Sequence, residues 1–499
     1  MPNLNLRPCL SFVAASFLPN VGWSHGFGER YDLPVPMIWV IAAACCVVLL
    51  SFLITPFIQH ASGNVTSRRL LYFQLDGPVS AMSTQNSWWS QTLKVISVSL
   101  LMLTWSAAMW GSADPLMNFS PTFIWIIWWL GTSFVCILFG NVWHHIDPWL
   151  AVFKGCSQLR RFVQVRPKEH SGPLETFRLR WPSKLARWPA CAMLLCWSAI
   201  EIIYPIASMP HRVGFCIAAY SLTTWTGMWL FGPSTWRHHA DGFSLYFELT
   251  SQARNMLLGK TAGSMAKIEK NTSATWSTVG LVIAIFTSVL FDGLHAGPGW
   301  LIFEKWASRI AIFQTDVNGY LMGSTGLLTL WLLLCCTYVF TCFATSRMLV
   351  FIAQNKNMQV DSQSLTLEFS NAFLASMMPI AMAYLIAHNF SSFVIQGQNI
   401  IALASDPMGW GWNIWGTSHY YPDVGLVDAK FTWYVATLSI VIGHVVSVIM
   451  AHRVACLFCT QLASKQNFWA LILNIPMTLV MIGFTALSLT LIAEPLVSS

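Results

Sequence analysis

Ten long, mostly apolar stretches constrain the fold of this chain more than any other feature of its sequence. A helix of about 20 residues crosses the roughly 30 Å hydrocarbon core of a bilayer, and these stretches approach or reach that length. Backbone groups in lipid must bond within the protein, and the stretches lack the alternation of barrel strands, so we expect helices. The stretches cover residues 37–58, 91–111, 121–143, 189–206, 213–231, 275–293, 321–345, 370–395, 431–451 and 469–491.

The composition of the 499 residues agrees with this interpretation. Only 9% are charged and 55% are hydrophobic, which is too little charge to cover the surface of a soluble domain of this size. The sequence therefore predicts an all-α polytopic transmembrane bundle of about 10 spanning helices, in contact with the lipid bilayer. The net charge of +7 does not indicate nucleic-acid binding, because basic residues of membrane proteins collect in cytoplasmic loops.

Residues 1–24 have the layout of a signal peptide. Arg7 precedes a short apolar run, Cys9–Leu18, and a small-x-small triplet ends at Ser24. Cleavage after Ser24 would leave His25 as the first residue, on the outer side of the membrane. An uncleaved anchor is the alternative, because the segment carries a single positive charge before its apolar run.

The distribution of basic residues predicts the orientation of residues 25–499, which we expect to form one transmembrane domain. With ten crossings and an outer N-terminus, 21 of the 27 Lys and Arg residues fall on the inner side and five on the outer side. Most of the inner ones lie in two predicted cytoplasmic loops, 154–187 and 232–271. Since positive residues mark the cytoplasmic side, both termini are expected to be extracytoplasmic. A long outer loop covers residues 396–430.

Four acidic or histidine residues lie inside the predicted spans and His295 lies just beyond the end of one; inside a membrane such groups each cost a few kcal/mol by insertion scales. Glu201, Asp292, His295 and His388 fall in the outer half of their helices, and His444 lies near the middle of its helix. The carboxylates Glu201 and Asp292 are candidates for a catalytic general base or a metal ligand, and His295, His388 and His444 for metal ligands. Separate helix-to-helix hydrogen bonds and a proton or ion path are the alternatives.

His25 is a further candidate metal ligand. If cleavage occurs after Ser24, one residue offers both a free α-amine and an imidazole, and these two nitrogens can chelate one metal ion. Copper suits a nitrogen-rich chelate of this kind. The alternative is that an N-terminal histidine has only a structural role.

Several stretches resemble a bacterial family of integral membrane proteins labelled fenitrothion hydrolase. They are HGFGERYDLPVP at 25–36, FGNVWHHIDPW at 139–149, WPACAMLLCWSAIEIIYP at 188–205, LFDGL at 290–294, IAMAYLIAHNFSSFVIQGQ at 380–398 and SDPMGWGWNIWGT at 405–417. The resemblance covers nearly the whole chain from residue 25. It implies a multi-pass protein of the bacterial inner membrane that hydrolyses organophosphorus triesters, and it assigns no catalytic residue.

Three functional hypotheses follow. The first is a membrane-embedded hydrolase of small apolar organophosphorus triesters, assisted by a divalent metal such as zinc, manganese or copper, because a bound metal activates water. The second is a copper-binding or metal-redox membrane protein that uses the His25 chelate. The third is a transporter, although the sequence shows no repeat of the kind that many transporters contain.

Overall fold

In the computed structural model, the described residues are 36–60, 88–163, 179–206, 209–257, 275–316, 318–354, 362–459 and 466–493. The part of the chain that these ranges cover contains helices and no strand. The helices are α2 (Met37–His60), α3 (Trp88–Trp110), α4 (Phe119–Pro121), the π-helix η3 (Thr122–Gly131), α5 (Thr132–Phe139), α6 (Trp143–Ile146), α7 (Pro148–Val163), α8 (Trp188–Ile202), α9 (Pro210–Phe231), α10 (Pro233–His239), α11 (Gly242–Leu257), α12 (Trp276–His295), α13 (Pro298–Ala307), η5 (Ala311–Phe313), α14 (Tyr320–Gln354), α15 (Ser362–Gln396), α16 (Asn399–Ser405), η6 (Val424–Leu426), α17 (Ala429–Phe458), α18 (Gln466–Leu473) and α19 (Ile475–Ala493).

The predicted all-α polytopic bundle is confirmed. Among the described residues, eight segments are long and apolar enough to cross a membrane: Met37–Phe57, Trp88–Trp110, Phe119–Phe139, Trp276–His295, Tyr320–Gln354, Leu365–Gln396, Ala429–Phe458 and Ile475–Ala493. The other two predicted stretches also form helices. They are α8, which is apolar but has only 15 residues, and α9, which has 22 residues.

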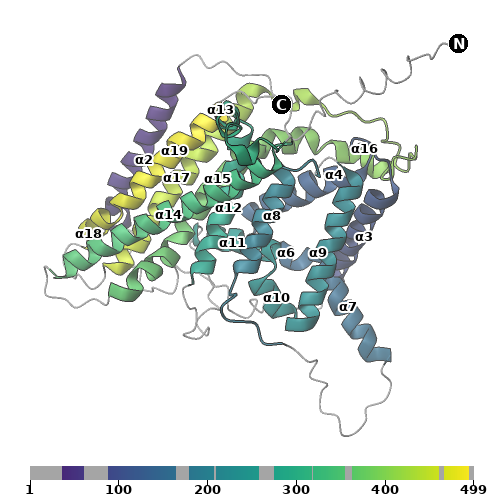
Figure 1. The fold of residues 1–499 in the computed structure, drawn as a ribbon, viewed down its shortest axis with the longest axis horizontal. Helices are drawn as coiled ribbons and strands as arrows, with labels where there is room; N and C mark the ends of the chain where they lie inside the picture. The colour runs from purple at the N-terminus through teal and green to yellow at the C-terminus, as the bar shows by residue number, and fades with distance from the viewer. Residues whose placement is uncertain are drawn as a thin grey trace, which may run out of the picture.

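Two helices form the centre of the bundle. About 94% of the most apolar part of α15 and 78% of that of α12 is buried inside the protein, against 17% for α2. α12 packs against α8, α14 and α15, and α15 packs against α17. α2, α17 and α19 lie on one side of this pair, and α3, α8 and α9 lie on the other (Figure 1). The burial explains why ionisable groups on α12 and α15 face protein and not lipid.

Small residues allow α15 and α17 to cross closely. A methyl group added at Gly443 of α17 would lie 2.3 Å from the Ala383 side chain and 2.8 Å from the Pro379 carbonyl of α15. Pro379 lacks an N–H, which leaves the preceding turn of α15 with an incomplete set of backbone hydrogen bonds. The Ser447 hydroxyl of α17 donates to the Ser376 carbonyl in that turn. The close contact therefore also satisfies a polar group that lipid could not.

The predicted loop 232–271 contains two helices, and the second of them is buried. α11 has Phe247, Leu249 and Ala253 fully inaccessible to solvent, and it packs against α5, α8 and α15. The chain therefore folds part of this segment back into the bundle, where Tyr246 approaches the spanning helices.

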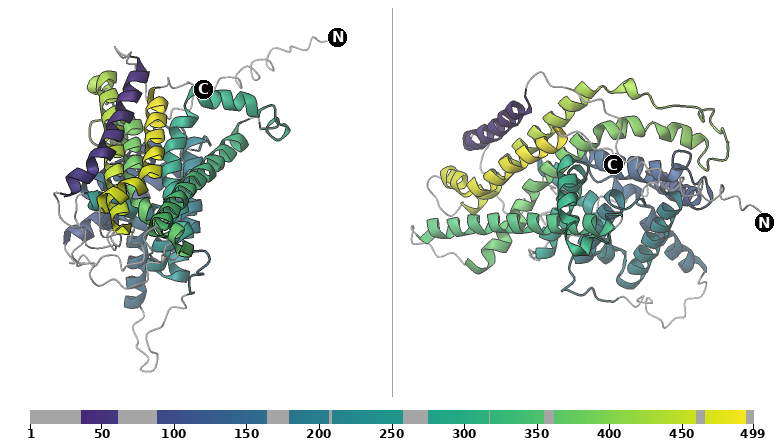
Figure 2. Two further views of the ribbon diagram at one scale, coloured as in Figure 1. Left: turned by 90° about the vertical axis from the view of Figure 1, so that its left-hand side faces the viewer. Right: turned by 45° about the horizontal axis from the view of Figure 1, so that its top comes forward.

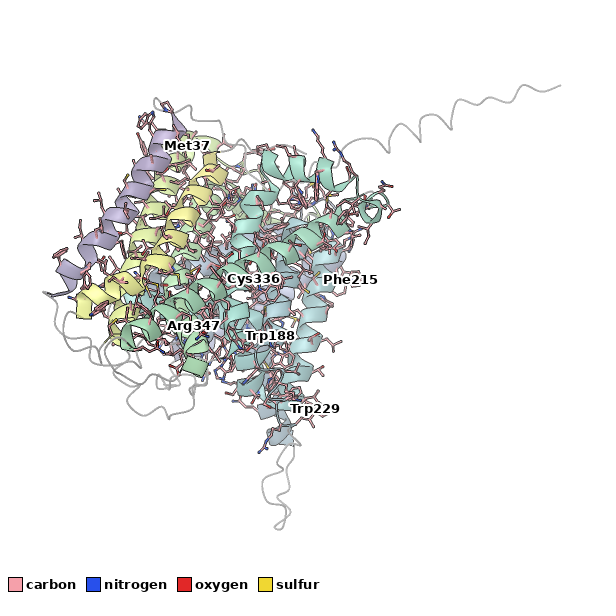
Figure 3. The ribbon with its side chains drawn as sticks, turned by 60° about the vertical axis from the view of Figure 1, so that its left-hand side comes forward. Met37, Trp188, Phe215, Trp229, Cys336 and Arg347 are labelled. Carbon is pink, nitrogen blue, oxygen red and sulfur yellow. The ribbon has the colours of Figure 1, made fainter. Side chains whose placement is uncertain are left out.

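The ends of the helices agree with an even number of crossings. α2 begins and α19 ends at the same end of the bundle (Figure 1), with Met37 at this end and Arg347 and Trp229 toward the other (Figure 3). α13 lies across the first end, as the further views show (Figure 2). Arg347 belongs to the set that the sequence assigns to the cytoplasmic side.

Candidate functional site

A small cavity inside the bundle brings two of the predicted carboxylates together. Glu201 near the end of α8 and Asp292 in the last turn of α12 face the same space. The lining comes from η3, α8, α11, α12 and α15 and consists of Trp129, Leu130, Leu194, Trp197, Glu201, Tyr246, Ile285, Ser288, Val289, Asp292, Leu385 and Asn389. The walls are thus mostly aromatic and aliphatic, and the carboxylates, hydroxyl and amide are the oxygen-bearing groups.

Glu201 reaches the cavity because α8 ends inside the protein. The helix closes at Ile202, where the Ile203 amide still donates to the Ala199 carbonyl, and Pro205 follows soon after. The Trp129 side chain donates a hydrogen bond to the Glu201 carboxyl group. This contact orients a carboxyl group in a cavity whose walls are mostly aromatic and aliphatic.

Trp129 belongs to an unusual element, the ten-residue π-helix η3. π-helical turns are rare and are found mainly at functional sites, because they change the direction in which side chains project. Here Trp125 stacks on Trp197 with ring centres 4.5 Å apart, and Trp129 packs on Tyr246 at 4.9 Å. The π-helix therefore places indole rings along one wall of the cavity.

Asp292 is paired with His388 of α15. The Nε2 atom of His388 lies 3.2 Å from Oδ2 of Asp292, and the two side chains are 10% and 19% exposed. Asp292 lines the cavity, whereas His388 is not among the lining residues. His388 thus holds Asp292 from outside the cavity, and a protonated imidazole would balance the aspartate charge.

Tyr384 lies beside this pair, one helical turn before His388. Its ring is nearly parallel to the imidazole, with ring centres 5.9 Å apart. A methyl group added at Gly293 would lie only 1.9 Å from the Tyr384 oxygen, so glycine after Asp292 is what allows the hydroxyl to approach. The hydroxyl is buried and has no hydrogen-bond partner among the described residues.

The cavity has the size of a water molecule and not of a large ligand. The centre of a water molecule can occupy about 20 Å³ of it, which is room for one or two waters. Trp197 supplies a buried indole N–H with no partner in the described part of the protein, and the carboxylates supply acceptors. A water between these groups would satisfy both.

Two of the other predicted metal ligands, His295 and His444, do not line this cavity. The His295 ring packs against Phe291 and Trp300, with ring centres 5.5 and 5.0 Å away. His444 is buried in α17, and its Nδ1 atom lies 2.8 Å from the Ile440 carbonyl oxygen. His25 lies outside the described residues.

Within the described ranges, no three His, Cys, Asp or Glu side chains are grouped so that they could hold a metal ion. Of the predicted histidine ligands that lie in the described ranges, His388 alone contacts one of the two carboxylates, Asp292. The zinc, manganese or copper site therefore stays a prediction.

A second buried charged cluster lies toward the other end of the bundle, and the sequence patterns did not single it out. Asp147 and Arg237 form an ion pair at 3.2 Å, and Asp241 accepts hydrogen bonds from Tyr220 and from Ser244. Burial raises the pKa of Asp147 to about 6; Arg237 opposes this shift, and Asp241 adds to it. The cluster joins the segment before α7 to α10, which are distant in sequence.

His144 next to this cluster is held neutral. Burial, with added repulsion from Arg237, lowers the pKa of His144 to about 4. Its ring contacts His145 edge to face, with centres 5.5 Å apart. The pair therefore belongs to the interface between the bundle and its inner helices, apart from the cavity.

The fold and the cavity define a polytopic α-helical membrane protein with ionisable side chains inside its bundle. Comparisons of the chain with protein-family models, curated proteins and solved structures give no match.

Proposed function

We propose that this protein binds and transfers protons inside the membrane, through a water held between Glu201 and Asp292. The observation that supports the proposal is that both carboxylates face one water-sized cavity, although they come from different helices. Ionisable residues inside spanning helices are costly, and proton relays are a common reason for their presence.

The charges of the site support uptake of one proton. With Glu201 and Asp292 ionised and His388 protonated, the three side chains carry a net charge of −1. A low-dielectric interior disfavours an unbalanced charge, so binding of one proton brings the site to neutrality. The carboxyl groups and the imidazole then share that proton as a coupled set, and not as independent groups.

The transfer step needs only groups that face the cavity. A protonated Glu201 donates its proton to the water, and the water gives a different proton to the Asp292 carboxylate. His388 stabilises the charged form of Asp292, and the Trp129 hydrogen bond stabilises the charged form of Glu201. Water between polar partners transmits the proton without movement of the helices.

Proton flux into proteoliposomes tests the proposal. The purified protein is reconstituted with a pH-sensitive dye inside, and a potassium diffusion potential drives the flux. Glu201→Gln should abolish the flux above that of empty vesicles, and it should remove one carboxyl band from the infrared difference spectrum. Glu304→Gln is the control, because Glu304 lies in α13 and accepts a hydrogen bond from Trp300 at the end of the bundle. Unchanged flux in Glu201→Gln would contradict the proposal.

A second candidate is hydrolysis of an organophosphorus triester, as the family resemblance implies. The observation that favours it is the contact of 3.2 Å between His388 and Asp292, in which the imidazole orients a carboxylate that faces the cavity. The Asp292 carboxylate would take a proton from water, the water oxygen would attack phosphorus, and the bond from phosphorus to the aryl oxygen would break, which releases the phenolate.

The two candidates make different demands on the cavity. A triester is far larger than one or two waters, so hydrolysis requires the aromatic wall to open, whereas proton transfer does not. Release of nitrophenolate from fenitrothion by reconstituted protein, lost in Asp292→Asn, would support hydrolysis. Proton flux without any such release would leave the first proposal alone. In both cases we expect a bacterial inner membrane, as the family resemblance implies, with both termini outside, as the basic loops indicate.

A further inference from the structure

The segment between α15 and α17 exposes an unusual number of large apolar side chains. We call residues 406–428 the aromatic loop. Trp415 is 72% exposed and Tyr421 is 82% exposed. The other large apolar or aromatic side chains that the loop exposes are Trp410, Trp412, Ile414, Tyr420, Val424 and Leu426. A loop in water normally shows the opposite pattern, because exposed apolar patches of this kind mark a contact with another apolar phase.

The polar groups of the same loop are directed toward its own backbone. Asp406 accepts from the amides of Trp410 at 3.0 Å and Gly411 at 2.7 Å. Asn413 accepts from the Ser405 hydroxyl and the Ser418 amide, both at 3.1 Å. The loop therefore bonds these polar groups to its own chain while its large apolar side chains stay exposed, as expected for a segment that contacts lipid.

The base of the loop is attached to the helical bundle. Gln398 accepts from the Tyr420 hydroxyl at 2.7 Å and from the Asp423 amide at 3.0 Å. Gly409 and Gly411 adopt positive φ angles, which permits the tight turns that display the aromatic rings. These contacts make the display a fixed feature of the fold.

The position of the loop matches the boundary between lipid and water. It connects the end of α16 at Ser405 with the start of α17 at Ala429; α16 follows α15, and α15 and α17 are both membrane spans. The Ser112 amide, just beyond the end of α3, donates to the Met408 carbonyl at 2.7 Å. The loop therefore lies level with the ends of three spans, at the same end as the start of α2 (Figure 1).

The apolar surface continues onto the neighbouring hairpin. Trp110, Leu116 and Met117 are each more than half exposed and lie between α3 and α4, beside the loop. Trp and Tyr favour the membrane interface because their rings are apolar and their polar groups can reach water. Residues 397–429 contain no Lys or Arg, so attraction to anionic lipid does not contribute.

We propose that the aromatic loop is inserted into the interfacial layer of the outer leaflet, with the bilayer itself as the occupant of its apolar surface. The loop then lies in the membrane plane and does not project into water as a soluble loop. This inference is independent of the function proposed for the cavity.

A photoreactive phospholipid tests the proposal on the intact protein. The protein is placed in nanodiscs of phosphatidylcholine that carry a carbene precursor near the headgroup, illuminated, digested and analysed by mass spectrometry. Peptides from residues 406–426 should be labelled at a level comparable to the span Met37–Phe57. The exposed polar residues 182–184 should stay unlabelled and serve as the control for water.

Variants identify the side chains responsible. Trp410→Ser combined with Trp415→Ser should lower labelling of the loop toward the level at 182–184. Tyr434→Ser, which removes an exposed aromatic ring of α17 outside the loop, should leave labelling of the loop unchanged. Equal labelling of Met37–Phe57 in all variants shows that the bundle remains inserted.

Two results would overturn the proposal. An unlabelled loop beside a labelled Met37–Phe57 would show that the aromatic surface faces water or is reserved for a protein partner. Labelling that requires anionic lipid and disappears in high salt would show an electrostatic attraction, which a loop without basic residues does not supply.

Discussion

At the scale of single residues, the depth of a side chain in the membrane does not by itself decide whether it reaches the cavity. The outer half of the predicted spans contains Glu201, Asp292, His295 and His388, so their depths would allow them to meet. The rotation of each helix also sets the direction in which its side chains project. His295 follows Asp292 by three positions and turns toward Trp300 of α13, away from the cavity. His388 reaches Asp292 because α15 presents it to α12.

The contact between Gly293 and Tyr384 gives a prediction about the site. Gly293→Ala should displace the Tyr384 ring and with it the imidazole that lies parallel to it, because the new methyl group would overlap the hydroxyl oxygen. Overpacking of this kind costs about 1–3 kcal/mol, so we expect a lower unfolding temperature in detergent. Adding Tyr384→Phe should recover part of the loss, since it removes the overlapping atom. Equal loss in the single and double variants would contradict this.

Asp147 gives a prediction about pH. Its pKa is raised from 3.8 to about 6 by burial, so the folded protein holds a proton that the unfolded chain releases. The contribution of protonated Asp147 to the free energy of unfolding is fully present below about pH 4 and is lost as the pH rises through about 6. A pKa shift of this size corresponds to about 3 kcal/mol. Asp147→Asn should therefore flatten the dependence of the unfolding temperature on pH between these values. A slope that persists in Asp147→Asn would assign it to another group.

At the scale of helices, close crossings depend on small residues whose importance is not visible in hydropathy. Gly443 and Gly483 both lie in apolar spans, α17 and α19, and their local sequences are similarly hydrophobic. A methyl group at Gly443 would overlap Ala383 of α15, whereas one at Gly483 would meet nothing within 4 Å. Only the packing of the helices distinguishes the two positions.

This difference gives a matched pair of variants. Gly443→Ala should separate α15 from α17, weaken the hydrogen bond from Ser447 to the Ser376 carbonyl and lower the unfolding temperature. Gly483→Ala should leave it unchanged or raise it slightly, because alanine favours the helix over glycine. Thermal unfolding of both variants in the same detergent measures the contrast. A similar effect of both substitutions would mean that the crossing tolerates added volume.

The π-helix η3 shows a further limit of local patterns. The stretch 121–143 is predicted as an ordinary spanning helix, but residues Thr122–Gly131 have π-helical hydrogen bonds and the helix ends at Phe139. From this segment Trp129 and Leu130 line the cavity, and Trp125 stacks on Trp197 of α8, which also lines it. Hydropathy is the same for both kinds of helix, so the sequence pattern could not separate them.

At the scale of the whole molecule, the orientation gives a prediction that does not depend on the cavity. A reporter fused after the last residue should lie outside, because α19 ends at the end of the bundle where α2 begins and the basic loops mark the other side as cytoplasmic (Figure 1). Alkaline phosphatase at this position should be active, and green fluorescent protein should be dark. A control fusion within residues 164–178 should give the reverse. The opposite pattern at the C-terminus would contradict ten crossings from an outer start.

The sequence alone determined that this protein is an all-helical membrane bundle and where its long apolar helices lie along the chain. Hydropathy and charge are properties of short segments, and lipid allows a long apolar segment few structures besides a helix. The tertiary structure decided which ionisable side chains meet, because that depends on the rotation and neighbours of each helix. Glu201, Asp292 and His388 lie close together for this reason, whereas His295, at a similar depth, and His444, nearer the middle of its helix, do not join them.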